Sequence, residues 1–166
     1  MNSGKRFEAN FKASVPPNVF CYRLKDGTAS WTSGDTRFQC SNICDYILFD
    51  GHELVLAELK SHKGKSLPLT AIRGNQVEQL KAATKFENVI PLLVVYFEDT
   101  EECFYLGATA LAEFIEKGER KSIPIEYFVS RGVKIPTKKK KVNTTHDLRV
   151  LFGELDPAWS FDWRLP

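Results

Sequence analysis

The sequence lacks long apolar segments. It contains no run of about eighteen consecutive apolar residues, which excludes a membrane-spanning helix of ordinary length. The opening stretch, MNSGKRFEANFKAS, is charged and has no apolar core of the kind that a secretory signal needs. We therefore expect a cytoplasmic protein with no membrane partner.

Cysteine is scarce, with four residues in the chain: Cys21, Cys40, Cys44 and Cys103. In a reducing compartment these are not expected to form disulfides. Cys40 and Cys44 could begin a zinc site, but no second cysteine pair and no paired histidines complete the pattern. Buried free thiols are the simpler expectation.

A strong excess of one charge is also missing. The chain carries 23 Lys and Arg against 21 Asp and Glu, and a net charge of +2 does not by itself indicate nucleic-acid binding. The positive charge is uneven, however, with GKR at 4–6, KSHKGK at 60–65 and KKKK at 138–141. Such runs usually lie in solvated loops, so they become informative only if a site lies between them.

What is present fits one α/β domain of 166 residues with a real core, because 43% of the residues are hydrophobic. Alternation and turn signals predict a strand hairpin at 44–49 and 53–60, joined at Asp50-Gly51. The other predicted elements are a helix at 3–14, two strands within 18–40, a helix at 69–86 capped by Thr70, strands at 91–99 and 103–108, a helix at 110–118 capped by Thr109 and closed by Gly118, and a short helix or turn at 123–132. The tail is poorly patterned, and the order of elements predicts a mixed central sheet in a single domain, 1–166.

The hairpin poses a chemical question, because Glu58 and Lys60 stand inside an apolar strand. Side chains alternate between the two faces of a strand, so these two share a face. If DGHE is a four-residue loop, Asp45 lies opposite Glu58; if only Asp50-Gly51 turns, Asp45 lies opposite Leu56. Both alternatives place Asp45 and Glu58 on the same face, close enough to hold one ion.

Two carboxylates held this close repel each other, and a hard divalent cation such as Mg²⁺ or Mn²⁺ resolves the conflict. Lys60 could then reach a phosphate or a nucleophilic water. This set suits metal-assisted phosphodiester hydrolysis. The alternative is a structural ion pair of Lys60 with Glu58 or with Asp45.

Several stretches together resemble the RecU-type Holliday junction resolvases, a branch of the restriction-endonuclease-like superfamily with its D…ExK signature. They are GKRFE at 4–8, CDYILFDGHELVLAELKS at 44–61, SLPL at 66–69, NQVEQL at 75–80 and GERKSIPIEYFVSRGVKIP at 118–136. The resemblance spans about residues 4–136. It implies metal ligation by Asp45, Glu58 and the carbonyl of Leu59.

The resemblance assigns further roles as well. Lys60 matches the catalytic lysine, Glu8 an acidic residue on the first helix, and Gln76 a glutamine near the site; without the resemblance, Glu8 and Gln76 would be taken for ordinary surface residues. It also implies a restriction-endonuclease-like mixed sheet flanked by helices, a homodimer, and a stalk that inserts at a four-way DNA junction. The stalk maps to residues 18–40.

The segment 18–40 carries aromatic and cationic side chains between turn signals, which by themselves predict a projecting ribbon. Two differences from the family stand out: Ile43 and Cys44 replace small hydroxyl residues before the Asp, and the extension before the first helix is nearly absent, as in a compact phage version. The residues that we expect to contact DNA are Arg23, Lys25, Trp31, Arg37, Lys63 and Lys65.

The sequence thus predicts a Mg²⁺- or Mn²⁺-dependent, structure-selective endonuclease that resolves four-way junctions, in a bacterial cell or a phage-infected host. Another D…ExK nuclease, a non-catalytic DNA-binding modulator of recombination, and a structural α/β protein with an ion-paired hairpin remain as alternatives. Preferential cleavage of four-way over linear DNA would exclude another D…ExK nuclease. Any metal-dependent turnover would exclude the non-catalytic modulator, and absence of divalent-ion binding would favour the structural protein.

Overall fold

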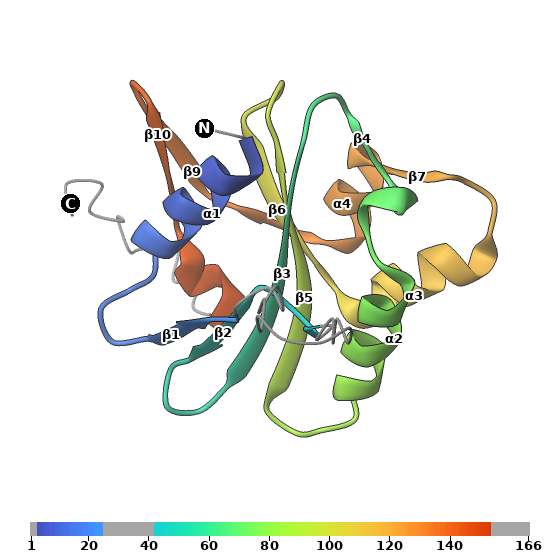
Figure 1. The fold of residues 1–166 in the computed structure, drawn as a ribbon, viewed down its shortest axis with the longest axis horizontal. Helices are drawn as coiled ribbons and strands as arrows, with labels where there is room; N and C mark the ends of the chain where they lie inside the picture. The colour runs from blue at the N-terminus through green and yellow to red at the C-terminus, as the bar shows by residue number, and fades with distance from the viewer. Residues whose placement is uncertain (1–2, 25–41, 154–166) are drawn as a thin grey trace, which may run out of the picture.

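The computed structural model describes residues 3–24 and 42–153, which form a six-stranded central sheet with helices on both faces (Figure 1). The strand order is β1-β2-β3-β5-β6-β8. Neighbours β3 and β5 are parallel and the other pairs are antiparallel, so the sheet is mixed. Its strands are β1 (Phe20–Arg23), β2 (Tyr46–Phe49), β3 (Leu54–His62), β5 (Val89–Phe97), β6 (Glu102–Gly107) and β8 (Val133–Ile135).

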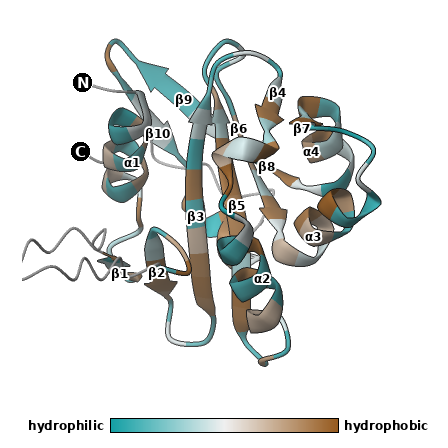
Figure 2. Ribbon diagram, turned by 45° about the vertical axis from the view of Figure 1, so that its right-hand side comes forward, coloured by the Kyte–Doolittle hydropathy of each residue, from teal (hydrophilic) through white to brown (hydrophobic). Residues whose placement is uncertain are grey.

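The helices divide between the two faces of the sheet (Figure 2). Helix α1 (Ser3–Ala13) covers one face, and α2 (Gly74–Ala83), α3 (Ala108–Lys117) and α4 (Ile125–Arg131) cover the other. Alternate residues of β5 show the division, because Leu92 and Val94 pack in the core that contains Phe11, whereas Leu93 and Val95 pack in the core beneath α3 and α4. The predicted α/β class, with a mixed central sheet flanked by helices, is confirmed.

Two small antiparallel sheets lie beside the main one. Strand β4 (Ser66–Pro68) pairs with β7 (Ser122–Pro124), and β9 (Thr137–Lys140) pairs with β10 (Asn143–His146). The two 3₁₀ helices are η1 (Leu69–Ala71) and η2 (Leu148–Phe152). Strand β10 and η2 pack on the α1 side, where His146 and Leu148 are buried.

Most predicted elements are present, but the boundaries of two helices were wrong. The helix expected at 69–86 begins only at Gly74, because Ser66–Pro68 pairs with β7 and the Leu69 N–H donates to the carbonyl of Lys121. Thr70 therefore caps nothing. Thr109 lies inside α3, after the N-cap Gly107, whereas Gly118 ends that helix in the left-handed region as predicted, at φ 65°. Strands β4, β7, β8, β9 and β10 and the helix η2 were not predicted from the sequence.

The expected ribbon at 18–40 needs a correction at its start. Residues Phe20–Arg23 form an edge strand of the central sheet, with Phe20 opposite Phe49 of β2, and do not project from it. The second expected strand, within residues 25–40, lies outside the described residues. Cys21, Cys44 and Cys103 are free thiols. No helix within 3–24 or 42–153 is long and apolar enough to cross a membrane.

Candidate active site

The predicted hairpin creates a notch in the sheet. Strand β2 pairs only with Leu54–Ala57, whereas β3 continues to His62. Asp45 stands where this pairing ends, and its N–H donates to the carbonyl of Ala57 at 3.1 Å. Among the described strands none pairs with this edge of β3 beyond that point, so the backbone of its last residues is unpaired by strands on the β2 side (Figure 1).

The loop of the hairpin decides between the two predicted registers. Phe49 lies opposite Leu54, which makes residues 50–53 a four-residue loop and places Asp45 opposite Glu58. The side chain of Asp50 fixes this loop, because its Oδ1 accepts hydrogen bonds from the N–H groups of His52 and Glu53, at 2.7 Å each. The four-residue alternative is correct.

Glu58 is the most buried charged group of the notch, with 1% of its surface exposed. Its Oε1 accepts from Lys60 Nζ at 2.6 Å and its Oε2 accepts from Gln76 Nε2 at 3.0 Å. Burial, and next the charge of Asp45, raise the pKa of Glu58, while Lys60 and Gln76 act in the opposite direction. The ion pair that we considered as the structural alternative therefore exists, within a site that also holds a second carboxylate.

Asp45 reaches the same edge from the other strand. Its Oδ2 accepts from the backbone N–H of Leu59 at 2.7 Å. In a strand, the N–H and C=O of one residue point to the same edge, so the carbonyl of Leu59 also faces the notch. Gln76 adds another oxygen, because its buried Oε1 has no hydrogen-bond partner among the described residues.

These atoms fit a hard divalent cation, which prefers carboxylate, carbonyl and water oxygens. Within the described residues no cluster of three or more His, Cys, Asp or Glu side chains could hold a metal. A cation here would therefore need Asp45, Glu58, the backbone carbonyl of Leu59 and water together, with Gln76 Oε1 beside them. Such a mixed set suits Mg²⁺ or Mn²⁺ better than zinc.

Glu8 lies at the rim of the notch, on α1, and is bound to Arg23 of β1. The Nη2 and Nε atoms of Arg23 donate to Glu8 Oε2 at 2.9 and 3.1 Å. Burial first and Glu8 second raise the pKa of Tyr46, and Asp45 contributes in the same direction. Arg23, which we expected to contact DNA, is thus held by an acidic side chain near the site.

Cys44 is a buried free thiol, as the sequence predicted. It is 1% exposed and packs with Leu56 and Leu80, and its Sγ donates to the carbonyl of Tyr46 at 3.3 Å. Burial, with the charges of Glu58 and Asp45, raises its pKa to about 12. Cys44 is therefore a neutral thiol in the α2-side core.

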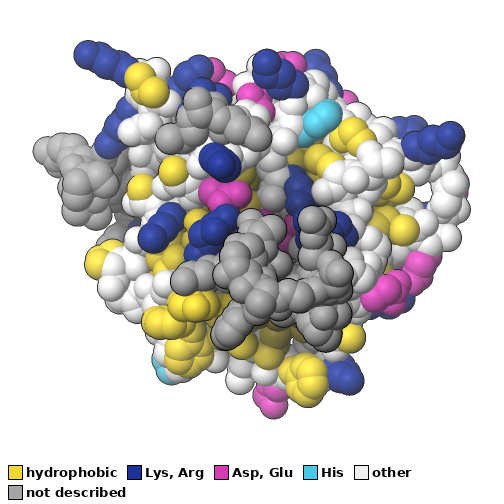
Figure 3. Space-filling view, viewed as in Figure 1, with side chains coloured by type: hydrophobic (Ala, Val, Ile, Leu, Met, Phe, Trp, Pro, Cys, Tyr) yellow, Lys and Arg dark blue, Asp and Glu magenta, His cyan; other side chains and the backbone are white. Residues whose placement is uncertain are grey.

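The remaining predicted residues are spread along the chain. Lys63 and Lys65 are exposed just beyond β3, whereas Lys25, Trp31 and Arg37 lie outside the described residues. Basic side chains gather on the face that contains α1 and the notch (Figure 3). No role was predicted for Arg6, which lies two residues before Glu8 on α1 and pairs with Glu98 at 3.9 Å.

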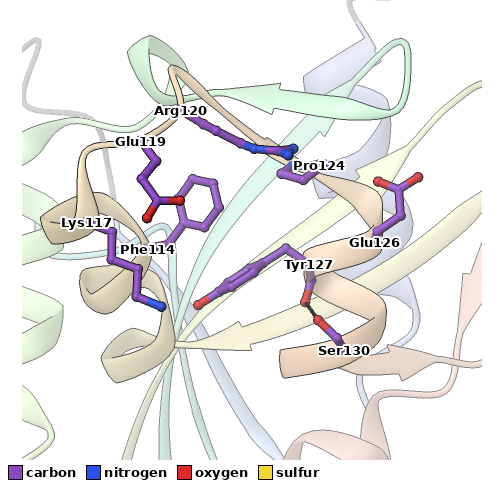
Figure 4. A pocket seen from close by; sticks show the side chains of 8 residues that line it. All are labelled: Phe114, Lys117, Glu119, Arg120, Pro124, Glu126, Tyr127 and Ser130. Atoms are coloured by element: carbon purple, nitrogen blue, oxygen red, sulfur yellow. Dashed lines mark hydrogen bonds between the residues drawn. The ribbon is translucent and has the colours of Figure 1, made fainter.

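A cavity of about 380 Å³ between α3 and α4 is the alternative place for a site. Phe114 and Tyr127 pack there with ring centroids 4.7 Å apart. Its two carboxylates, Glu119 and Glu126, lie on opposite sides of this aromatic pair (Figure 4). They cannot act on one ion together, so the notch at Asp45 and Glu58 is the better candidate.

The class of protein follows from a mixed sheet in which Asp45 lies opposite Glu58 of β3, with Lys60 and the buried Gln76 of α2 bound to Glu58. The model of the family described as Recombination protein U matches residues 12–146, and the chain belongs to this family. It is 32% identical to the SPbeta prophage-derived uncharacterized protein YotM of Bacillus subtilis (strain 168), over 93% of this chain and 87% of that protein.

Relatives with a stated activity are more distant. The chain is 25% identical to the Holliday junction resolvase RecU of Streptococcus equi subsp. zooepidemicus (strain MGCS10565), over 59% of this chain and 49% of the relative. The chain therefore spans about half the length of these streptococcal relatives. A solved structure of Hjc, a Holliday junction resolvase of Archaeoglobus fulgidus, overlaps 79% of this chain and 95% of Hjc, with a TM-score of 0.49 and 18% identity.

Proposed function

We propose that this chain is a Mg²⁺- or Mn²⁺-dependent endonuclease that resolves four-way DNA junctions by hydrolysing phosphodiester bonds. The observation that carries the proposal is the buried Glu58, which lies opposite Asp45 on the same face of the sheet and bonds Lys60 and Gln76. Membership of the Recombination protein U family and similarity to proteins named Holliday junction resolvase support the substrate.

Asp45, Glu58 and the carbonyl of Leu59 would hold the metal ion. The ion, when bound, would polarise the phosphate and lower the pKa of water. The raised pKa of Glu58 supports this assignment, because burial first and the charge of Asp45 second disfavour its carboxylate, and a bound cation would offset both effects.

The protein's own groups have distinct roles in this proposal. Lys60 pairs with Glu58 at 2.6 Å, and with a metal ion bound its ammonium would be available to a phosphate oxygen or to the attacking water. Gln76 orients the Glu58 carboxylate through a bond of 3.0 Å. Glu8 and Arg23 form the rim, where Arg23 can exchange its carboxylate partner for a DNA phosphate.

A junction has two strands to be cut at related positions, so two sites in a twofold homodimer would fit the substrate. The stalk at 18–40, now restricted to the part after Arg23, remains a proposal, with Lys25, Trp31 and Arg37 as its contacts. The prophage origin of the relative YotM supports a role in the cytoplasm of a bacterial cell or a phage-infected host.

The test is an incubation of the purified protein with a synthetic four-way junction and with a linear duplex of the same arms, in Mg²⁺, in Mn²⁺ and in chelator. We expect paired nicks in the junction only when metal is present. Equal cleavage of the linear duplex would indicate another D…ExK nuclease. Junction binding without cleavage in either metal would indicate a non-catalytic modulator of recombination.

A further inference from the structure

The hairpin of β9 and β10 carries a cluster of lysines, Lys138–Lys141, that the proposed function has not used. Lys140 lies opposite Asn143, so Lys141 and Val142 form a two-residue turn at the tip. Turns of this kind favour glycine or asparagine, yet Lys141 has a φ of +28° and Val142 is 75% exposed. The two residues at the tip are therefore not the ones that a turn of this kind favours, and Val142 is left exposed to solvent.

The base of the hairpin is firmly anchored to the domain. The N–H of His146 donates to Ser14 Oγ at 3.0 Å, and its ring packs on Phe7 and Tyr96, with centroids 5.5 and 5.8 Å apart. On the other strand, Lys139 pairs with Glu101. The exposed lysines are thus held at a fixed place near α1.

A hollow of about 410 Å³ lies between the hairpin, α1 and the end of β3. The charged residues that line it are Arg6, Lys63, Glu98, Asp99, Lys139 and Lys141. Its acidic groups already have partners, because Glu98 accepts from Ser61 Oγ at 2.9 Å and Asp99 accepts from the Gly64 N–H at 2.9 Å. Lys63, Lys140 and Lys141 form no ion pair with any described residue.

The hollow adjoins the end of β3, on the face of the sheet opposite the Glu58 and Lys60 side chains. Ser61, the residue after Lys60, lines it, and Lys63 follows two positions later. Three residues of strand span about 10 Å, which corresponds to about three base pairs of duplex DNA. A DNA strand that passes from the notch around the end of β3 would meet Lys63 within that distance, and the hairpin lies on the other side of the hollow from there.

We propose that this hollow and the β9–β10 tip bind the sugar-phosphate backbone of a duplex arm beside the scissile phosphate, with Lys63, Lys140 and Lys141 as the phosphate contacts. The inference rests on the proposed function for its substrate. It adds a second DNA-contacting element, separate from the stalk and built on a rigid part of the fold. Because its contacts are to phosphates, they strengthen binding without selecting sequence.

The test compares the double variant Lys140→Gln/Lys141→Gln with the control Lys85→Gln/Lys121→Gln, which removes the same charge from exposed positions elsewhere. Binding to the junction is measured in chelator, so that no cleavage occurs, at several salt concentrations. Each phosphate contact contributes about 0.9 to the slope of log affinity against log salt. Loss of two contacts predicts that wild-type protein loses about twelvefold more affinity than the hairpin variant between about 50 and 200 mM salt.

The control variant should keep the wild-type slope, and circular dichroism should show that both variants are folded. A hairpin variant with the wild-type slope, or a control variant with an equal change, would overturn the inference. If that result came with metal-dependent junction cleavage by the wild-type protein, the proposed function would stand without it. A wild-type protein that neither binds nor cuts the junction would overturn both.

Discussion

Replacing Lys60 by methionine should destabilise the metal-free protein, because it leaves the buried Glu58 carboxylate without its cation. The two groups are 2.6 Å apart, with Glu58 1% exposed and the Lys60 side chain 23% exposed. Breaking a buried ion pair by removing one partner costs about 3–5 kcal/mol. The partial exposure of Lys60 reduces this, so we expect about 2–4 kcal/mol at pH 7.5.

The cost should depend on pH in a defined direction. Burial already raises the pKa of Glu58, and loss of Lys60 raises it further. The folded state then binds a proton more readily than the unfolded state, so the penalty is present at high pH and shrinks as the pH falls and Glu58 becomes protonated. Lys60→Met should therefore approach wild-type stability in mild acid.

Urea unfolding in chelator measures this, and the expected loss moves the midpoint by about 1–2 M at an m-value of roughly 2 kcal/mol/M. Glu58→Gln/Lys60→Met is the matched control, because it removes both charges and should recover most of the lost stability. Equal destabilisation by Lys60→Met at pH 7.5 and in acid would refute the reasoning. So would a double variant that is less stable than Lys60→Met alone.

Three further outcomes are expected. Burial lowers the pKa of His146 to about 4, so the free energy of unfolding should fall by about 3 kcal/mol between pH 7 and pH 4. In His146→Gln the urea midpoint should depend less on pH over that range, and a midpoint with the wild-type pH dependence would contradict this. Glu8→Gln breaks a partly exposed pair with Arg23, so stability should change by less than about 1 kcal/mol while junction cleavage slows at least about tenfold; a wild-type rate would reduce Glu8 to a surface residue. Lys25→Ala/Arg37→Ala should weaken binding to the four-way junction far more than to the linear duplex, and equal loss on both would leave only a general electrostatic role.

The carboxylate pair could be predicted because strand alternation is local. Any even-numbered hairpin loop keeps Asp45 and Glu58 on one face, so the prediction did not depend on the exact turn. Likewise, Gly118 ended α3 as expected, since glycine adopts the left-handed conformation without strain.

The failures came from contacts distant in the sequence. Pairing of β4 with β7, more than fifty residues away, displaced the start of α2 from Leu69 to Gly74. The bond of Gln76 to Glu58 joins a helix to a strand, so periodicity within either element says nothing about it, and only the family resemblance placed Gln76 near the site. The β9–β10 hairpin was not predicted, because both of its strands are polar and lack the apolar alternation that identifies a strand in a sequence.

The central claim is that Asp45 serves a metal-dependent cleavage centre, and the cleavage rate of Asp45→Asn on a four-way junction tests it most directly. The rate is measured under single turnover in Mg²⁺, with enough enzyme to bind all of the DNA in both wild type and variant. Asparagine keeps the shape of the side chain but removes its charge. The account predicts wild-type junction affinity with cleavage reduced by at least about a hundredfold, whereas cleavage at the wild-type rate would contradict it.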